Sequence, residues 1–159
     1  AEDFVPRGYT PLFDAVGRGI SSLDERLAKT GDKKAILVVV TDGFENSSKE
    51  FTLKKVQELI ADKRSKGWLV IFLGAGLEAA QQGLNMGFRV DTIANIGLTQ
   101  TNLQSVSRSV YAMNSSYAGA AAGAEESTMD SLSFSDEDRK AMGDGSAGEG
   151  LKPVKAKLP

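Results

Sequence analysis

The sequence contains neither cysteine nor histidine. Without cysteine the chain can form no disulfide bond and no catalytic thiolate, and without histidine it can form no Ser-His-Asp or Cys-His arrangement. The two absences together exclude an ordinary zinc site. Any metal that the chain binds must therefore be a hard cation held by oxygen atoms, such as Mg²⁺, Ca²⁺ or Mn²⁺.

Excess positive charge and long hydrophobic runs are also lacking. The net charge is -2 and the pI is about 5.3, which argues against a nucleic-acid partner because such proteins carry clustered Lys and Arg. No segment approaches the roughly 18 apolar residues of a membrane span, so we expect no membrane contact. The opening Ala-Glu-Asp-Phe does not resemble a signal peptide. With no cysteine to oxidise, we expect a cytoplasmic location.

The 159 residues suffice for one domain with a hydrophobic core. Apolar residues at steps of three and four predict helices, and short apolar runs predict strands. The helices are expected at about 11–30, 53–66, 77–86 and 101–117, and the strands at 35–40, 68–73 and 90–96. This alternation predicts an α/β fold with a parallel, doubly wound sheet.

The composition changes after Tyr117, which divides the sequence into a folded part, 1–117, and a linker and low-complexity tail, 118–159. Within the tail, Ser135 and Asp138 have the spacing of a capping box and predict a short helix near 135–142. The sequence closes with a short basic stretch, Lys-Pro-Val-Lys-Ala-Lys. We expect this tail to be flexible and solvated; the alternative is a peptide that binds a partner.

An aspartate directly follows the most apolar strand of the sequence. The run Ala35–Val40 has no polar residue, which predicts a parallel strand that is covered on both faces. Asp42 lies just beyond its carboxyl end, which is where open α/β sheets bind ligands. Asp-Gly is also a common turn sequence, so Asp42 and Gly43 could form only a turn. Thr10, at the start of the preceding helix, reads by itself as a helix cap.

Taken together, GYTPLFDA (8–15) and VVVTDGFENSS (38–48) resemble two of the three metal-site loops of the von Willebrand factor type A (vWA) domain, most closely its bacterial members. Those members carry a Gly-x-Thr-x-Leu-x-Asp-Ala helix start and a strand that ends in Thr-Asp-Gly. The resemblance covers roughly residues 4–117 and includes the strand at 68–73.

The resemblance implies a Rossmann-like, three-layer fold and a protein–protein interaction module that depends on Mg²⁺. Thr10 matches the threonine that contacts the metal through its hydroxyl, and Asp42 matches the aspartate that acts through a water molecule. A carboxylate of the protein partner then completes the metal site. Hard oxygen ligands of this kind suit Mg²⁺, which prefers octahedral geometry and retains waters.

The sequence departs from the family pattern in one large respect. It has no Asp-x-Ser-x-Ser loop, which supplies the other three of the five expected ligands. It also supplies only the last three strands of the family order 3-2-1-4-5-6, so the strand at 35–40 would be an unguarded apolar edge. We therefore expect the sequence to be the carboxyl-terminal part of a longer domain, whose missing strands come from upstream sequence or from another chain.

Two other functions remain open. The chain could be a structural or assembly protein that keeps a degenerate vWA fold and has lost the metal. It could also be a nucleotide-binding or hydrolytic enzyme, although Gly74-Ala75-Gly76 lacks the third glycine of a nucleotide-binding turn. Asp14 and Glu45 could act as general acid and base, but we expect a helix-start charge and a solvated loop residue instead. We therefore expect no enzymatic activity.

Overall fold

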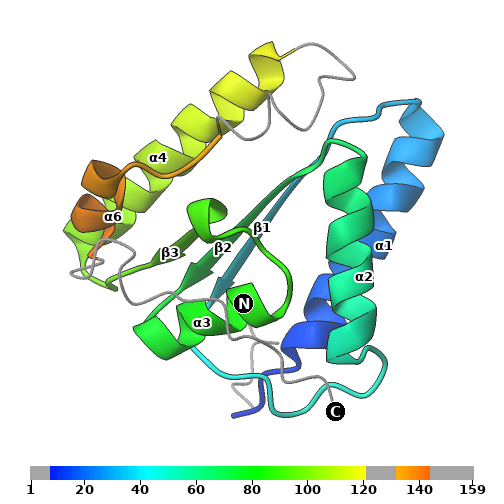
Figure 1. Ribbon diagram of the computed structural model, residues 1–159, viewed down its shortest axis with the longest axis horizontal. Helices are drawn as coiled ribbons and strands as arrows, with labels where there is room; N and C mark the ends of the chain where they lie inside the picture. The colour runs from blue at the N-terminus through cyan, green and yellow to red at the C-terminus, as the bar shows by residue number, and fades with distance from the viewer. Residues whose placement is uncertain (1–7, 121–131, 144–159) are drawn as a thin grey trace, which may run out of the picture.

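The computed structural model describes residues 8–120 and 132–143, and Figure 1 shows their arrangement. Strands and helices alternate along these residues, as the apolar pattern predicted. The elements are α1 (Leu12–Thr30), β1 (Ile36–Thr41), α2 (Leu53–Ser65), β2 (Leu69–Gly74), α3 (Leu77–Asn85), the 3-10 helix η1 (Val90–Thr92), β3 (Ile93–Asn95), α4 (Gln100–Gly119) and α6 (Asp136–Met142).

The strands form one parallel sheet in the order β1-β2-β3. Val38 pairs with Ile71 and Val40 with Leu73, so each valine lies on the same face of the sheet as its partner. Helices α1 and α2 lie on one side of the sheet, and α4 and α6 lie on the other (Figure 1). The expected α/β fold with helices on both faces is therefore present.

Each face of the sheet has its own hydrophobic core. On the α1 side, alternate residues of β2 pack against α1, α2 and α3, and the largest are Val70 and Phe72. On the α4 side, the intervening residues Leu69, Ile71 and Leu73 pack against α4 and α6. Every residue of β2 is buried. This strand is the centre of the described sheet.

β1 does not match the prediction that it is covered on both faces. Val38 is 38% exposed and Val40 is 64% exposed, because α4 packs over β2 and β3 and leaves the adjoining face of β1 open. The other edge of β1 pairs with no strand among residues 8–120 and 132–143. The carbonyls of Ala35 and Thr41 face β2 and accept hydrogen bonds from Leu69 and Ala75. By alternation, the backbone groups of Ile36, Val38 and Val40 point toward this free edge.

The start of α1 and the third strand differ from the sequence prediction. Thr10 does not cap α1: the residue at the cap position is Pro11, whose side chain makes no capping hydrogen bond. The third strand is shorter than 90–96, because residues 90–92 form the η1 turn that closes when the Thr92 N–H donates to the Arg89 carbonyl at 3.0 Å. No helix in the described part of the chain is long and apolar enough to cross a membrane.

The short helix predicted near 135–142 is present as α6. Its capping box is complete, because the Ser135 hydroxyl accepts from the Asp138 N–H and the Asp138 carboxylate accepts from the Ser135 N–H. Asp138 also accepts a hydrogen bond from the Ser109 hydroxyl of α4 at 2.6 Å. Three nearby apolar side chains, Leu132, Phe134 and Met142, are buried in the α4-side core. Part of the expected linker thus packs on the domain; the basic stretch lies outside the described residues.

Candidate functional site

The two residues singled out as metal ligands lie at the carboxyl end of the sheet. Thr10 precedes α1 and Asp42 follows β1, yet the two segments touch. A methyl group built on Gly43 would lie 2.8 Å from the Thr10 hydroxyl oxygen, so only glycine leaves room for the threonine there. Asp42, the neighbour of Gly43, is exposed to solvent. The fold therefore brings the Thr10 hydroxyl and the Asp42 turn together.

Hydrogen bonds between backbone and side-chain groups hold these two segments together. The Thr10 N–H donates to the side-chain oxygen of Asn46 at 2.8 Å, and the Asn46 N–H donates back to the Thr10 carbonyl at 3.2 Å. Within the turn itself, the Thr41 hydroxyl accepts from the Gly43 N–H at 3.2 Å and donates to the Gly43 carbonyl at 3.0 Å. The turn after β1 and the start of α1 are thus fixed relative to each other.

Glu45 also connects the loop after β1 to the start of α1. Its carboxylate accepts from the Phe13 N–H at 2.9 Å, from the N–H groups of Ser47 and Ser48 at 2.9 and 2.7 Å, and from the Ser48 hydroxyl at 2.6 Å. Burial raises the pKa of Glu45, but these hydrogen bonds outweigh burial and hold the pKa below its ordinary value. The expectation of a solvated loop residue is wrong: Glu45 organises the loop.

Asp14 plays the reciprocal role from α1. Its side chain is only 7% exposed, and its carboxylate accepts from the N–H groups of Lys49, Glu50 and Phe51, each at 2.9 Å. Burial raises the pKa of Asp14, and the three hydrogen bonds lower it by more, so the pKa lies below its ordinary value. Asp14 is therefore more than a helix-start charge. Both carboxylates are already engaged by the backbone, which disfavours the general acid and base interpretation.

Helix α3 also contacts the loop after β1. The Gln82 side chain donates to the Gly43 carbonyl at 3.2 Å and accepts from the Glu45 N–H at 2.8 Å, so it ties α3 to the loop after β1. Gly74 lies where β2 meets α3: a methyl group there would lie 2.3 Å from the Ala80 backbone nitrogen. Close packing of α3 thus accounts for this glycine without a bound phosphate. Gln82 gave no sequence signal, because helix periodicity marks buried apolar positions only, whereas Asn46 lies within the second motif (38–48).

The donors present at this end of the sheet do not by themselves fit a magnesium ion. Thr10 and Asp42 offer a hydroxyl and a free carboxylate, while Asp14 and Glu45 are committed to backbone N–H groups. Within the described ranges no group of three or more acidic, histidine or cysteine side chains could hold a metal. Mg²⁺ requires near-octahedral oxygen coordination, so further oxygen ligands must come from outside these residues.

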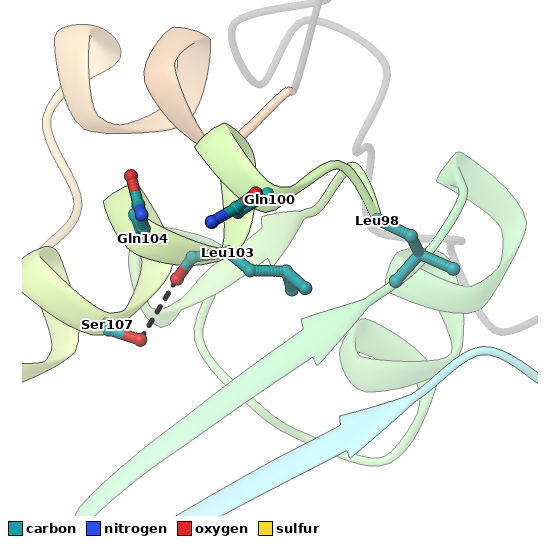
Figure 2. Close-up of a pocket in the computed structure, with 5 residues that line it drawn as sticks. All are labelled: Leu98, Gln100, Leu103, Gln104 and Ser107. Atoms are coloured by element: carbon teal, nitrogen blue, oxygen red, sulfur yellow. Dashed lines mark hydrogen bonds between the residues drawn. The ribbon is translucent and has the colours of Figure 1, made fainter.

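A second exposed surface lies along β1, on the side that α4 covers only in part. It consists of Val38 and Val40 on β1. Leu98 and Leu103, which follow β3 in the chain, are also exposed, at 64% and 42%. Figure 2 shows that these leucines line a hollow next to α4. The other residues that line the hollow are Gln100, Gln104 and Ser107. The lining carries no charge. We call Val38 and Val40 the β1 surface.

No family model matches the sequence, and no curated protein or solved structure matches it either. The vWA resemblance therefore rests on the sequence motifs and patterns alone. What the structure adds is independent of any family: a parallel α/β sheet, an organised junction at its carboxyl end, and a β1 strand whose outer edge pairs with no described strand.

Proposed function

We propose that this chain belongs to a protein–protein interaction module of the vWA type, which binds its partner at the carboxyl end of the sheet. The observation that carries the proposal is the contact between the Thr10 hydroxyl and the turn at Asp42 and Gly43. Residues from two separate motifs meet there, and the Asp14 and Glu45 hydrogen bonds hold them in place. Such rigid support is typical of a preorganised binding site.

In this proposal the metal site is shared between this chain and another segment. Thr10 and Asp42 supply two oxygen donors, and the remaining oxygens come from upstream sequence or from a second chain. When the set is complete, Mg²⁺ supplies an electrophilic position that an acidic side chain of the partner occupies. Asp42 is exposed and has no ion-pair partner among the described residues, so its carboxylate is available for this role.

The free edge of β1 supports the same proposal. The strand Ile-Leu-Val-Val-Val-Thr contains no charged residue and no proline, which are common protections of natural edge strands. The β1 surface adds exposed valines on the face next to that edge. A neighbouring strand with its own covering helix would satisfy the backbone groups and bury the valines. We propose that the segment that supplies the missing oxygen ligands also supplies this strand.

The test is a magnesium titration by calorimetry on a protein that includes the sequence encoded upstream of Ala1. We expect binding that weakens about 10–100-fold on Asp42→Ala, which is the usual cost of removing a group that acts through a ligand water. Thr10→Val, which removes the hydroxyl and keeps the size, should weaken binding further. The matched control is Asp32→Ala, which removes an exposed carboxylate at the opposite end of β1. Binding that survives Asp42→Ala unchanged would contradict the site.

A metal-independent assembly protein is the second candidate, and the incomplete donor set favours it. In that case the free edge of β1 alone holds the partner strand. The two proposals differ in one measurement: assembly of the extended protein in the presence of EDTA. Assembly and partner binding that are unchanged by EDTA would support the second candidate and remove the need for Mg²⁺.

A further inference from the structure

A small pocket lies between the loop after β1 and helix α3, next to the candidate site. Two of its lining side chains are apolar and well exposed: Phe44 at 50% and Leu77 at 42%. The lining consists of Phe44, Leu77, Glu78, Gln81, Gln82 and Asn85. The Gln82 bridge to Gly43 and Glu45 fixes one wall of this pocket. The pocket has room for an apolar side chain.

The charge around this pocket is negative. Glu78 lines it and is exposed, and Asp42 stands two residues before Phe44. Neither carboxylate takes part in any ion pair within the described part of the chain. The nearest basic side chain on the same loop is Lys49, while Arg18 on α1 is already paired with Glu50. An occupant that combines apolar side chains with positive charge would therefore fit best.

The sequence contains such a segment. Residues 151–158 read Leu-Lys-Pro-Val-Lys-Ala-Lys-Leu, with three lysines, three large apolar residues and no acid. The central Pro153 favours an extended backbone on either side of it. We call this segment the basic tail. Its apolar side chains match the exposed Phe44 and Leu77 of the pocket, and its lysines match the negative charge around it.

The end of α6, after which the basic tail follows in the sequence, lies at the same end of the sheet as the pocket. The Gly97 N–H, just after β3, donates to the Met142 carbonyl at 2.7 Å, which places the end of α6 at the carboxyl end of the sheet. The connection from 144 to 150 has seven residues and can span about 23–25 Å when extended. β1 lies two strands away from β3, about 10 Å at the usual strand spacing. The basic tail can therefore reach the pocket without any rearrangement.

We propose that the basic tail docks intramolecularly in the pocket between the loop after β1 and α3. One of its apolar side chains fills the space between Phe44 and Leu77, and its lysines lie near Glu78 and Asp42. A connection of only seven residues gives the tail an effective concentration of the order of millimolar, so even a weak contact is occupied.

The experiment uses paramagnetic relaxation on the full chain, which has no native cysteine, so Ala156→Cys gives a single nitroxide site. In EDTA, we expect selective broadening of the amide signals of Phe44, Leu77 and Gln81 relative to the reduced label. The signal of Gly31, at the opposite end of the sheet, should keep its intensity. Because no metal is present, a negative result would leave the interaction module untouched.

Two variants decide whether the pocket and the charges cause the broadening. Glu78→Lys in the pocket, and the triple change Lys152→Glu, Lys155→Glu and Lys157→Glu in the tail, should each abolish it, and the two combined should restore it. Glu25→Lys, an exposed site on α1, is the control and should leave it unchanged. The spectra themselves report whether each variant is folded.

Three results would overturn the proposal. Broadening that spreads evenly over the exposed amides means that the tail has no preferred site. Broadening that persists in Glu78→Lys means that it docks elsewhere. A sample that mixes isotope-labelled protein without nitroxide and unlabelled protein with nitroxide detects contacts between copies; equal broadening there means that the tail binds a second copy.

Discussion

β1 and β2 are similar in sequence but differ in what surrounds them. One reads Ile-Leu-Val-Val-Val-Thr and the other Leu-Val-Ile-Phe-Leu-Gly, and they pair residue for residue. Yet every position of β2 is buried, whereas β1 buries only Thr41 fully and exposes Val38 and Val40. The difference arises because helices pack over both faces of β2, whereas α4 leaves the adjoining face of β1 open.

The comparison shows where the stability of β1 comes from. On the α1 side, Leu37 and Val39 pack against the core, so this face contributes hydrophobic burial. On the α4 side, the exposed valines contribute little. The carboxyl end of β1 is instead held by the hydrogen bonds of Glu45 and Asp14. β1 is thus stabilised by one face and by its junction with α1, and β2 by both faces.

The largest effect should come from truncating register partners on the two strands. Ile71→Ala removes a fully buried side chain and should cost about 2–5 kcal/mol of the free energy of unfolding. Val38→Ala, at the paired position, should cost about 0.5 kcal/mol or less because that side chain is 38% exposed. Urea denaturation of both variants measures the difference. Similar losses would mean that another molecule covers β1 in solution.

The next effect concerns the carboxyl end of β1. Glu45→Gln keeps the shape of the side chain but weakens its hydrogen bonds to the loop and to Phe13, which should cost about 1–3 kcal/mol. Thermal unfolding and urea denaturation measure the loss. Glu25→Gln, an exposed site on α1, is the control and should change little. If both variants behave alike, the junction does not stabilise β1.

The same carboxylates make stability depend on pH. The pKa of Glu45 is lowered in the folded protein from its ordinary 4.5, and that of Asp14 from 3.8. Their contribution is therefore complete above those ordinary values and is lost as the pH falls through the lowered folded values. We expect the free energy of unfolding to fall on acidification below about pH 4.5, and to fall less steeply in Glu45→Gln. Parallel pH profiles for the two proteins would contradict this assignment.

The smallest effect on stability should come from charging the free edge. Val40→Lys places a charge on a side chain that is 64% exposed, so the free energy of unfolding should change by about 0.5 kcal/mol or less. An edge lysine opposes pairing with another strand, so self-association at high concentration should decrease. Sedimentation velocity measures this association. Tyr111→Lys adds the same charge to an exposed site on α4 and should not reduce it.

The candidate site was only partly predictable from sequence. Thr10 and Asp42 were selected because each lies in a short motif, and the fold does bring their segments into contact. The roles of Asp14, Glu45 and Gln82 were not predictable. A carboxylate that accepts hydrogen bonds from a loop more than thirty residues away leaves no local pattern, and its sequence neighbours do not distinguish it from a solvated acid. Only contacts between distant segments separate the two cases.

The sequence by itself determined the local structure. Apolar periodicity located the helices and strands, and the spacing of Ser135 and Asp138 located the start of α6, because both signals depend on neighbours within one or two turns. It also determined that the run Ala35–Val40, which forms most of β1, is apolar throughout. Only the tertiary structure decided that β1 has one free edge and one open face. Burial depends on which elements pack against a strand, and that is a property of the whole fold rather than of the strand.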